Sequence, residues 1–139
     1  MSVQPYLFFS NGRCEEALNF YAEALNGRIE FLTRFKDAPE QPSSEDCGTV
    51  SPEHVMHANL RILDTQIMAS DGARPEDRFG GFSLSIAAAT PEDARRYYDA
   101  LVVGGQATMP VQETFWAFAF GMLVDRFGVS WMVNCPRPG

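Results

Sequence analysis

Two short stretches of the sequence carry side chains that could do chemistry, and the first is HVMHANLRI, residues 54–62. His57 and Asn59 alternate there with apolar residues, so in a strand they point away from Met56 and Ala58. A neutral imidazole can act as a base near pH 7, and an amide can hold developing negative charge. His57 is therefore a candidate general base. The alternative interpretation is a hydrogen-bonded structural histidine.

The second stretch is QETFW, residues 112–116, which places polar side chains beside two aromatic rings. Gln112 and Glu113 offer hydrogen bonds and a carboxylate, and Trp116 offers an apolar wall, the combination that small-molecule sites use. Glu113 is the second candidate general base. The alternative is a strand end at which Glu113 faces water and Trp116 fills the core.

The elements that must position these residues occur twice. EEALNFY (15–21) and EDARRYY (92–98) match at an offset of 77 residues, and both have the apolar periodicity of an amphipathic helix. At the same offset the strand-like YLFFS (6–10) aligns with SLSIA (83–87). Alternation puts one set of side chains on the face opposite Leu7. That set is Tyr6, Phe8, Ser83 and Ser85.

Strand-like runs follow each predicted helix. They are 27–35, 54–62 and 65–70 in the first copy, and 106–111, 115–124 and 129–134 in the second. Residues 36–53 are rich in Pro, Ser and acid and predict a mobile loop. Each copy thus has the order βαβββ. We expect a single α+β domain over residues 1–139, built of modules 1–71 and 80–139, with a helix on one face of each sheet.

Composition narrows the class of function. Eleven basic against eighteen acidic residues give a net charge of −7, which disfavours binding to nucleic-acid phosphates. No apolar run approaches the roughly 20 residues that span a bilayer, so we expect a cytoplasmic protein that does not bind a membrane. The three cysteines, Cys14, Cys47 and Cys135, are odd in number and widely spaced, which predicts reduced thiols with packing roles.

Several motifs in this order resemble a known family. The runs GRCEEALNFYAEAL, IMASD, GGQATMPVQETFW and DRFGVSWM are similar to those of PhnB-like proteins. These belong to the vicinal oxygen chelate, or glyoxalase/bleomycin resistance/dioxygenase, superfamily, and are often labelled demethylubiquinone methyltransferases. The resemblance implies an eight-stranded curled cup that binds a small molecule, and a homodimer.

The resemblance also locates the metal ligands of the superfamily. They fall on Tyr6 and Ser83 in the first strands and on Met68 and Met132 in the last strands. A divalent transition metal needs imidazole or carboxylate donors, and none of these four residues offers one. We therefore expect no metal, and without a dinucleotide or Walker motif we expect no cofactor. The other residues expected to line the cup are Phe8, Asn59, Ser85, Gln112, Trp116 and Trp131.

Three functional hypotheses follow. In the first, the cup binds a small organic molecule without the usual metal, and its reaction is unassigned. In the second, as in bleomycin-resistance proteins, an acidic groove of a dimer sequesters a cationic drug or toxin between Trp116 and Trp131. In the third, a metal-dependent lyase or dioxygenase has a rebuilt site that includes His57.

Overall fold

The computed structural model describes residues 1–37 and 51–138, which form two compact units, Met1–Asp77 and Arg78–Gly139. Most of the predicted mobile loop, with Cys47, lies outside the described residues. The boundary between the units follows Asp77, which lies between the predicted modules 1–71 and 80–139. Within the described ranges, no helix is long and apolar enough to cross a membrane.

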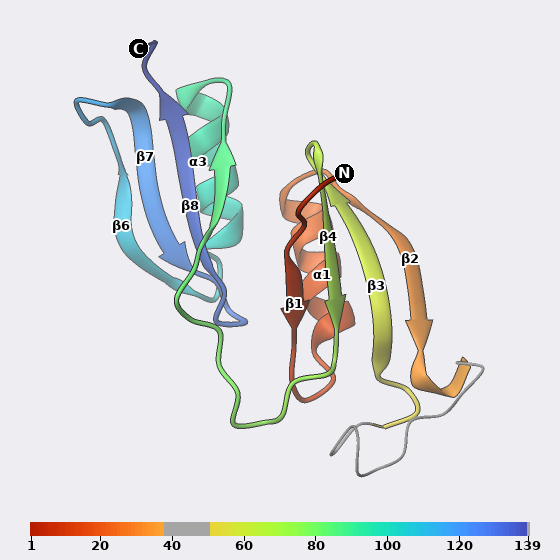
Figure 1. Cartoon of the computed structure of the whole chain (residues 1–139). Helices are drawn as coiled ribbons and strands as arrows, with labels where there is room; N and C mark the ends of the chain where they lie inside the picture. Colours follow the sequence, from red (N-terminus) through yellow and green to blue (C-terminus); the bar gives the residue numbers. More distant parts are fainter. Residues whose placement is uncertain (38–50, 139) are drawn as a thin grey trace. The chain divides into compact units, whose positions relative to one another are not determined.

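The first unit is a four-stranded sheet with a helix against one face (Figure 1). Its elements are β1 (Tyr6–Phe8), α1 (Cys14–Ala24), β2 (Arg28–Arg34), the 3-10 turn η1 (Phe35–Asp37), β3 (Val55–Ile62) and β4 (Thr65–Ser70). The strand order is β1-β4-β3-β2. β1 runs parallel to β4, and the other neighbours are antiparallel.

The second unit repeats this plan with β5 (Leu84–Ala87), α3 (Pro91–Leu101), β6 (Gln106–Gln112), β7 (Ala117–Val124) and β8 (Ser130–Pro136). Its strand order, β5-β8-β7-β6, is that of the first sheet, and β5 is again parallel to its neighbour. The predicted βαβββ duplication and α+β class are therefore confirmed.

The two helices begin differently. Thr90 is the N-cap of α3, and its hydroxyl accepts a 3.1 Å hydrogen bond from the backbone N–H of Asp93. Arg13 occupies the same position in α1 and supplies no side-chain cap. Instead Asp71, which follows β4, accepts a 2.8 Å hydrogen bond from the N–H of Cys14. A remote carboxylate thus replaces the missing local cap.

The core of each unit lies between its sheet and its helix. Residues of β1, β3, β4, β5, β7 and β8 are buried with the apolar stripe of the helix, as alternation predicts for Leu7. The strands β2 and β6 contain no buried residue. Tyr21 and Tyr98, equivalent in the duplicated helices, are both buried. Further buried sheet residues include Ala58, Leu60, Ile62, Ile67 and Ala69 in the first unit and Ile86, Ala119, Leu123, Trp131, Val133 and Cys135 in the second.

Two expectations about the strands need correction. Thr33 pairs with His57 but Arg34 pairs with Val55, so Met56 is the extra residue of a β-bulge. Val55 is consequently buried where the alternation placed Met56. In the second unit β7 begins at Ala117, so Phe115 and Trp116, expected in the strand, lie in the preceding turn.

Equivalent glycines, Gly27 and Gly105, directly precede β2 and β6. A Cβ atom on Gly27 would lie 2.4 Å from the carbonyl oxygen of Arg61, and one on Gly105 would lie 2.2 Å from that of Val124. Both distances are far below van der Waals contact. Each glycine is therefore required by the close approach of two neighbouring strands, and the duplication has kept this approach in both units.

Candidate functional site

The face of the first sheet that points away from α1 brings together five of the predicted site residues. Strand register places Tyr6 beside Met68, and Met68 beside Asn59. Two positions along the strands, and hence on the same face, stand Phe8 and His57. We call these five residues, together with Phe31, which pairs with Asn59, the exposed face of the first sheet.

A chain of hydrogen bonds runs across this face from β1 to β3. The hydroxyl of Tyr6 lies 3.0 Å from Nδ1 of His57, and Nε2 of His57 lies 2.9 Å from Oδ1 of Asn59. An amide oxygen only accepts, so Nε2 of His57 carries the proton and donates it. Nδ1 is then unprotonated in the neutral ring and accepts from the Tyr6 hydroxyl. The arrangement is a directed relay, Tyr6 to His57 to Asn59.

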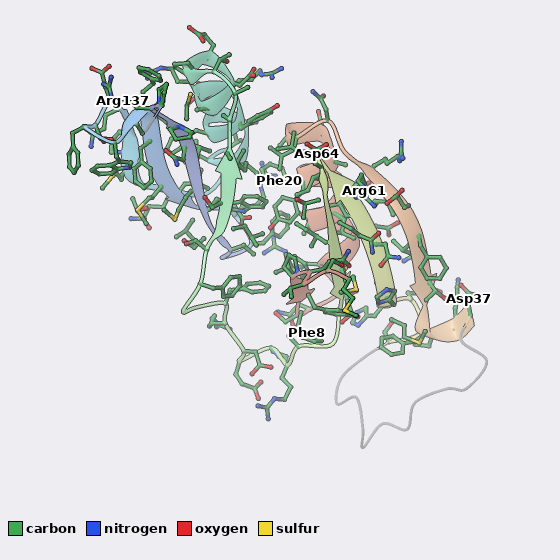
Figure 2. The ribbon with its side chains drawn as sticks, turned by 45° about the horizontal axis from the view of Figure 1, so that its top comes forward. Phe8, Phe20, Asp37, Arg61, Asp64 and Arg137 are labelled. Carbon is green, nitrogen blue, oxygen red and sulfur yellow. The ribbon has the colours of Figure 1, made fainter. Side chains whose placement is uncertain are left out.

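Aromatic rings flank this relay. The rings of Tyr6 and Phe8 stack with centroids 4.7 Å apart, and the ring of Phe31 lies 6.2 Å from that of His57. Phe8 is 55% exposed and Phe31 50% exposed, so both present large apolar surfaces to solvent. Figure 2 shows Phe8 at the end of β1. A polar chain between exposed rings suits a planar organic molecule that needs both stacking and a hydrogen bond.

Sequence reasoning missed Phe31. In RIEFLTR strict alternation puts Phe31 with Ile29, whose strand partner Leu60 is buried on the side of the helix. A bulge at Glu30 breaks the alternation, because Ile29 pairs with Leu60 while Phe31 pairs with Asn59. The extra residue turns Phe31 to the other face. A bulge of this kind has no signal in a single sequence.

Tyr6 has a perturbed phenol. Burial raises its pKa above the ordinary value, a hydrogen bond with the Ser70 side chain lowers it, and the nearby Cys14 raises it slightly. The net shift is upward, so the phenol stays protonated at neutral pH. Ser70 is itself buried and also accepts a hydrogen bond from the N–H of Gly72.

Charged side chains occupy the far end of the same face, where Figure 2 shows Arg61 on β3. Nε of Arg61 lies 3.2 Å from a carboxylate oxygen of Glu30, and its Nη2 lies 3.4 Å from Oε1 of Gln66. Gln66 in turn donates to Gln4. Because Arg61 is paired with Glu30, the face gains polarity there without a large net charge.

The predicted residues of the second unit fall into two places. Ser83, Ser85 and Met132 share the sheet face opposite α3, where the hydroxyl oxygens of Ser83 and Ser130 lie 2.6 Å apart. On the same face, register pairs Asn134 with Phe120. Within the described residues, Oδ1 of Asn134 is a buried oxygen that has no hydrogen-bond partner.

Gln112, Glu113 and Trp116 lie at the turn between β6 and β7. The carboxylate of Glu113 is paired at 2.8 Å with Arg137, and its side chain is 67% exposed. This geometry matches the alternative interpretation, in which Glu113 faces water. Trp116 is 45% exposed, and its ring meets that of Phe120 edge to face at 5.6 Å. Arg137 also donates to the carbonyl of Thr114, so it braces the turn.

The expected position of Trp131 on the ligand face is wrong. Its side chain is 1% exposed, and its indole N–H donates a 2.8 Å hydrogen bond to the buried carboxylate of Asp125. Alternation along β8 puts Trp131 with the buried Val133 and Cys135, facing α3. Its neighbour Met132 therefore takes the opposite face. Trp131 is part of the core of the second unit.

Cys14 and Asp71 are structural. Cys14 is fully buried, and burial, followed by the charges of Asp71 and Glu15, raises its thiol pKa strongly. A nucleophilic cysteine needs the opposite shift. The two carboxylate oxygens of Asp71 accept from the N–H groups of Cys14 and Val55, both at 2.8 Å. Asp71 thus joins α1 to β3.

No group of three His, Cys, Asp or Glu side chains comes together as a metal site in residues 1–37 and 51–138. Both ring nitrogens of His57 contact neutral side chains, those of Tyr6 and Asn59. In the third hypothesis His57 is a metal ligand, and these contacts would have to break for it to bind a metal.

Comparison with known proteins finds relatives over the whole chain. The family model described as 3-demethylubiquinone-9 3-methyltransferase matches residues 1–134. Protein YjdN of Escherichia coli is 38% identical over 141 residues, covering 96% of this chain and 95% of YjdN. Protein PA1353 from Pseudomonas aeruginosa is 38% identical and covers 99% of both chains with a TM-score of 0.85.

Two further solved structures have the same fold. The PhnB protein from Bacillus cereus is 25% identical with a TM-score of 0.80, covering 97% of this chain and 99% of the other. A glyoxylase/bleomycin resistance protein/dioxygenase domain from Frankia is 16% identical with a TM-score of 0.69, covering 100% and 93%. The second likeness concerns the fold alone.

Proposed function

Because the chain belongs to the PhnB-like family described as 3-demethylubiquinone-9 3-methyltransferase, within the glyoxalase/bleomycin resistance/dioxygenase superfamily, we propose that it binds a small organic molecule. The binding site is the exposed face of the first sheet. The observation that carries this proposal is the Tyr6–His57–Asn59 relay, held at 3.0 and 2.9 Å between the exposed rings of Phe8 and Phe31.

The family description does not decide the chemistry. A methyl transfer needs a site for the methyl donor, and the sequence has no nucleotide motif that would supply one. The relay supplies acid–base groups and an aromatic surface, which support ligand binding and proton transfer. We propose that no metal takes part, because the superfamily's ligand positions hold Tyr6, Met68, Ser83 and Met132.

A binding screen tests this function. Small planar aromatic compounds are screened by thermal shift, and hits are measured by titration calorimetry against the wild type, Phe31→Ala and His57→Ala. Loss of the Phe31 ring should weaken binding about fivefold, since an aromatic contact is worth about 1 kcal/mol. Phe82→Ala, which removes another exposed phenylalanine, is the matched control and should leave binding unchanged. If Phe31→Ala and His57→Ala both bind the ligand as tightly as the wild type does, this face is not the site.

A second candidate function, sequestration of a cationic drug or toxin, is favoured by the β6–β7 turn. Trp116 and the 89% exposed Phe115 present aromatic surface there, next to Phe120 and the unpartnered oxygen of Asn134. The net charge of −7 would attract a cation. Binding of this kind weakens strongly with added salt and is lost in Trp116→Ala, whereas binding at the relay is insensitive to both.

We also propose a cytoplasmic homodimer. Cys14 and Cys135 are both free and buried, which fits a reducing compartment. The dimer is proposed from the resemblance to the superfamily, and sedimentation equilibrium tests it directly. A monomer at all concentrations would remove the groove that the second candidate function requires.

A further inference from the structure

We infer that the molecule bound at the relay is a neutral weak acid with its acidic proton on oxygen, a phenol or an enol, and that it donates this proton to the oxygen of Tyr6. The inference rests on the proposed function and names the class of ligand. It follows from the direction of the hydrogen bonds on the exposed face of the first sheet.

Asn59 sets that direction. Its Oδ1 lies 2.9 Å from Nε2 of His57 and can only accept, so the proton of the neutral ring stays on Nε2. Nδ1 of His57, 3.0 Å from the Tyr6 hydroxyl, must therefore accept the phenol proton. With its proton directed at His57 and one lone pair facing the Ser70 hydroxyl, the Tyr6 oxygen can offer a ligand only its other lone pair. A hydroxyl group satisfies this lone pair, whereas an ether or carbonyl oxygen would be repelled by it.

The relay can then move a proton without leaving an unstable intermediate. The O–H bond of the ligand breaks as an O–H bond to Tyr6 forms, and the original Tyr6 proton passes to Nδ1 of His57. The products are the ligand oxyanion and an imidazolium, and the phenol of Tyr6 is regenerated. Burial disfavours a free phenolate at Tyr6, so the two transfers occur together.

The charged groups of this face gather around Arg61, at the end of the face far from His57. The ionisable side chains on it are Tyr6 of β1, Arg28 and Glu30 of β2, and His57 and Arg61 of β3, while β4 contributes the uncharged Gln66, Met68 and Ser70. Arg28 and Arg61 both pair with Glu30, at 3.5 and 3.2 Å. The imidazolium would keep its Nε2–H bond to Asn59. His57 thus contacts Tyr6 and not the ligand. It orients the Tyr6 hydroxyl and accepts the proton of that hydroxyl.

Two probes separate this inference from simple stacking. 4-Nitrophenol has the hydroxyl proton, and 4-nitroanisole has a methyl group in its place. Titration calorimetry should give about three- to tenfold tighter binding of 4-nitrophenol, the worth of one hydrogen bond. Tyr6→Phe should abolish this difference while still binding both. Tyr97→Phe, which removes a tyrosine hydroxyl from α3, is the matched control and should preserve it.

The protonation of His57 is read by two-bond ¹H–¹⁵N spectra, which are simple because the chain has two histidines, and His54→Gln assigns them. Free protein should show the Nε2–H form. Adding 4-nitrophenol should convert His57 to the imidazolium in the wild type but not in Tyr6→Phe. In the wild type this should occur at a pH below that at which free 4-nitrophenol ionises.

An Nδ1–H form in the free protein, or equal affinity for the two probes, would overturn the inference and leave small-molecule binding in place. If neither probe binds, the inference and the proposed function fail together.

Discussion

The carboxylate of Asp71 accepts a 2.8 Å hydrogen bond from the backbone N–H of Cys14, the first residue of α1. Its second oxygen accepts from the N–H of Val55 at the same distance, and the side chain is 2% exposed. One buried charge therefore satisfies an open helix end and a strand end together. These bonds tie α1 and β3 to the end of β4, next to Ser70 and the relay.

Asp71→Asn should destabilise the first unit, because its new amide NH₂ would face a backbone N–H in place of a carboxylate oxygen. We expect the free energy of unfolding to fall by about 2–4 kcal/mol, as for other broken buried networks. Urea denaturation measures the change. Asp64→Asn, at the exposed turn between β3 and β4, is the control and should stay within about 0.5 kcal/mol of wild type. Equal values for the two variants would show that Asp71 is dispensable.

Gly27 and Gly105 give a prediction about the duplication. Alanine at either position places a Cβ atom within 2.4 Å of a carbonyl oxygen in the neighbouring strand, so the strands must separate. We expect each variant to lose about 2 kcal/mol or more in urea denaturation. Gly80→Ala, where an added Cβ meets nothing within 4 Å, should change stability by less than about 0.5 kcal/mol. A tolerated Gly27→Ala would mean that β2 and β3 can move apart freely.

Much of the fold follows from the sequence because its signals are periodic. The matched helices and the alternation in β1 depend on local spacing, and the structure has them as predicted. Alternation also explains why Tyr6, His57 and Asn59 share a face. Their hydrogen-bonded order could not be predicted, because it depends on register between strands 51 residues apart in the chain.

The errors have identifiable causes. Bulges at Glu30 and Met56 shift the alternation by one residue, which exposes Phe31 and buries Val55. Trp131 is a different case, because it is adjacent to Met132 and two consecutive strand residues cannot face the same side. The apolar Val133 and Cys135 share its parity, so the sequence alone contained the signal that places Trp131 in the core.

The buried thiol of Cys14 predicts a loss of stability at high pH. Its pKa is raised in the folded protein, so above the ordinary value of 9.0 the thiol ionises only in the unfolded chain. The unfolded state then binds fewer protons, and the free energy of unfolding falls as pH rises, by up to about 1.4 kcal/mol per pH unit. Tyr6 and Tyr98, whose pKa values are also raised, add to the loss only above 10.0.

Urea denaturation of wild type and Cys14→Ala between pH 9 and pH 10 checks this prediction, with pH 7 as the reference. The variant should be less stable at pH 7 because it leaves a small cavity, but its stability should fall less steeply above pH 9. Parallel pH profiles would show that the thiol ionises equally in both states.

Metal content provides the last prediction. The superfamily positions hold Tyr6, Met68, Ser83 and Met132, and thioethers and hydroxyls bind Fe, Mn, Ni or Zn ions weakly. Protein purified without chelator or metal-affinity tag should contain less than about a tenth of an equivalent of any such ion by mass spectrometry, and should retain none after soaking and desalting. If metal is retained in near-stoichiometric amount, His57→Ala decides its site. Metal lost in that variant would return a rebuilt metal centre to first place, because His57 would then bind the ion in place of Tyr6 and Asn59.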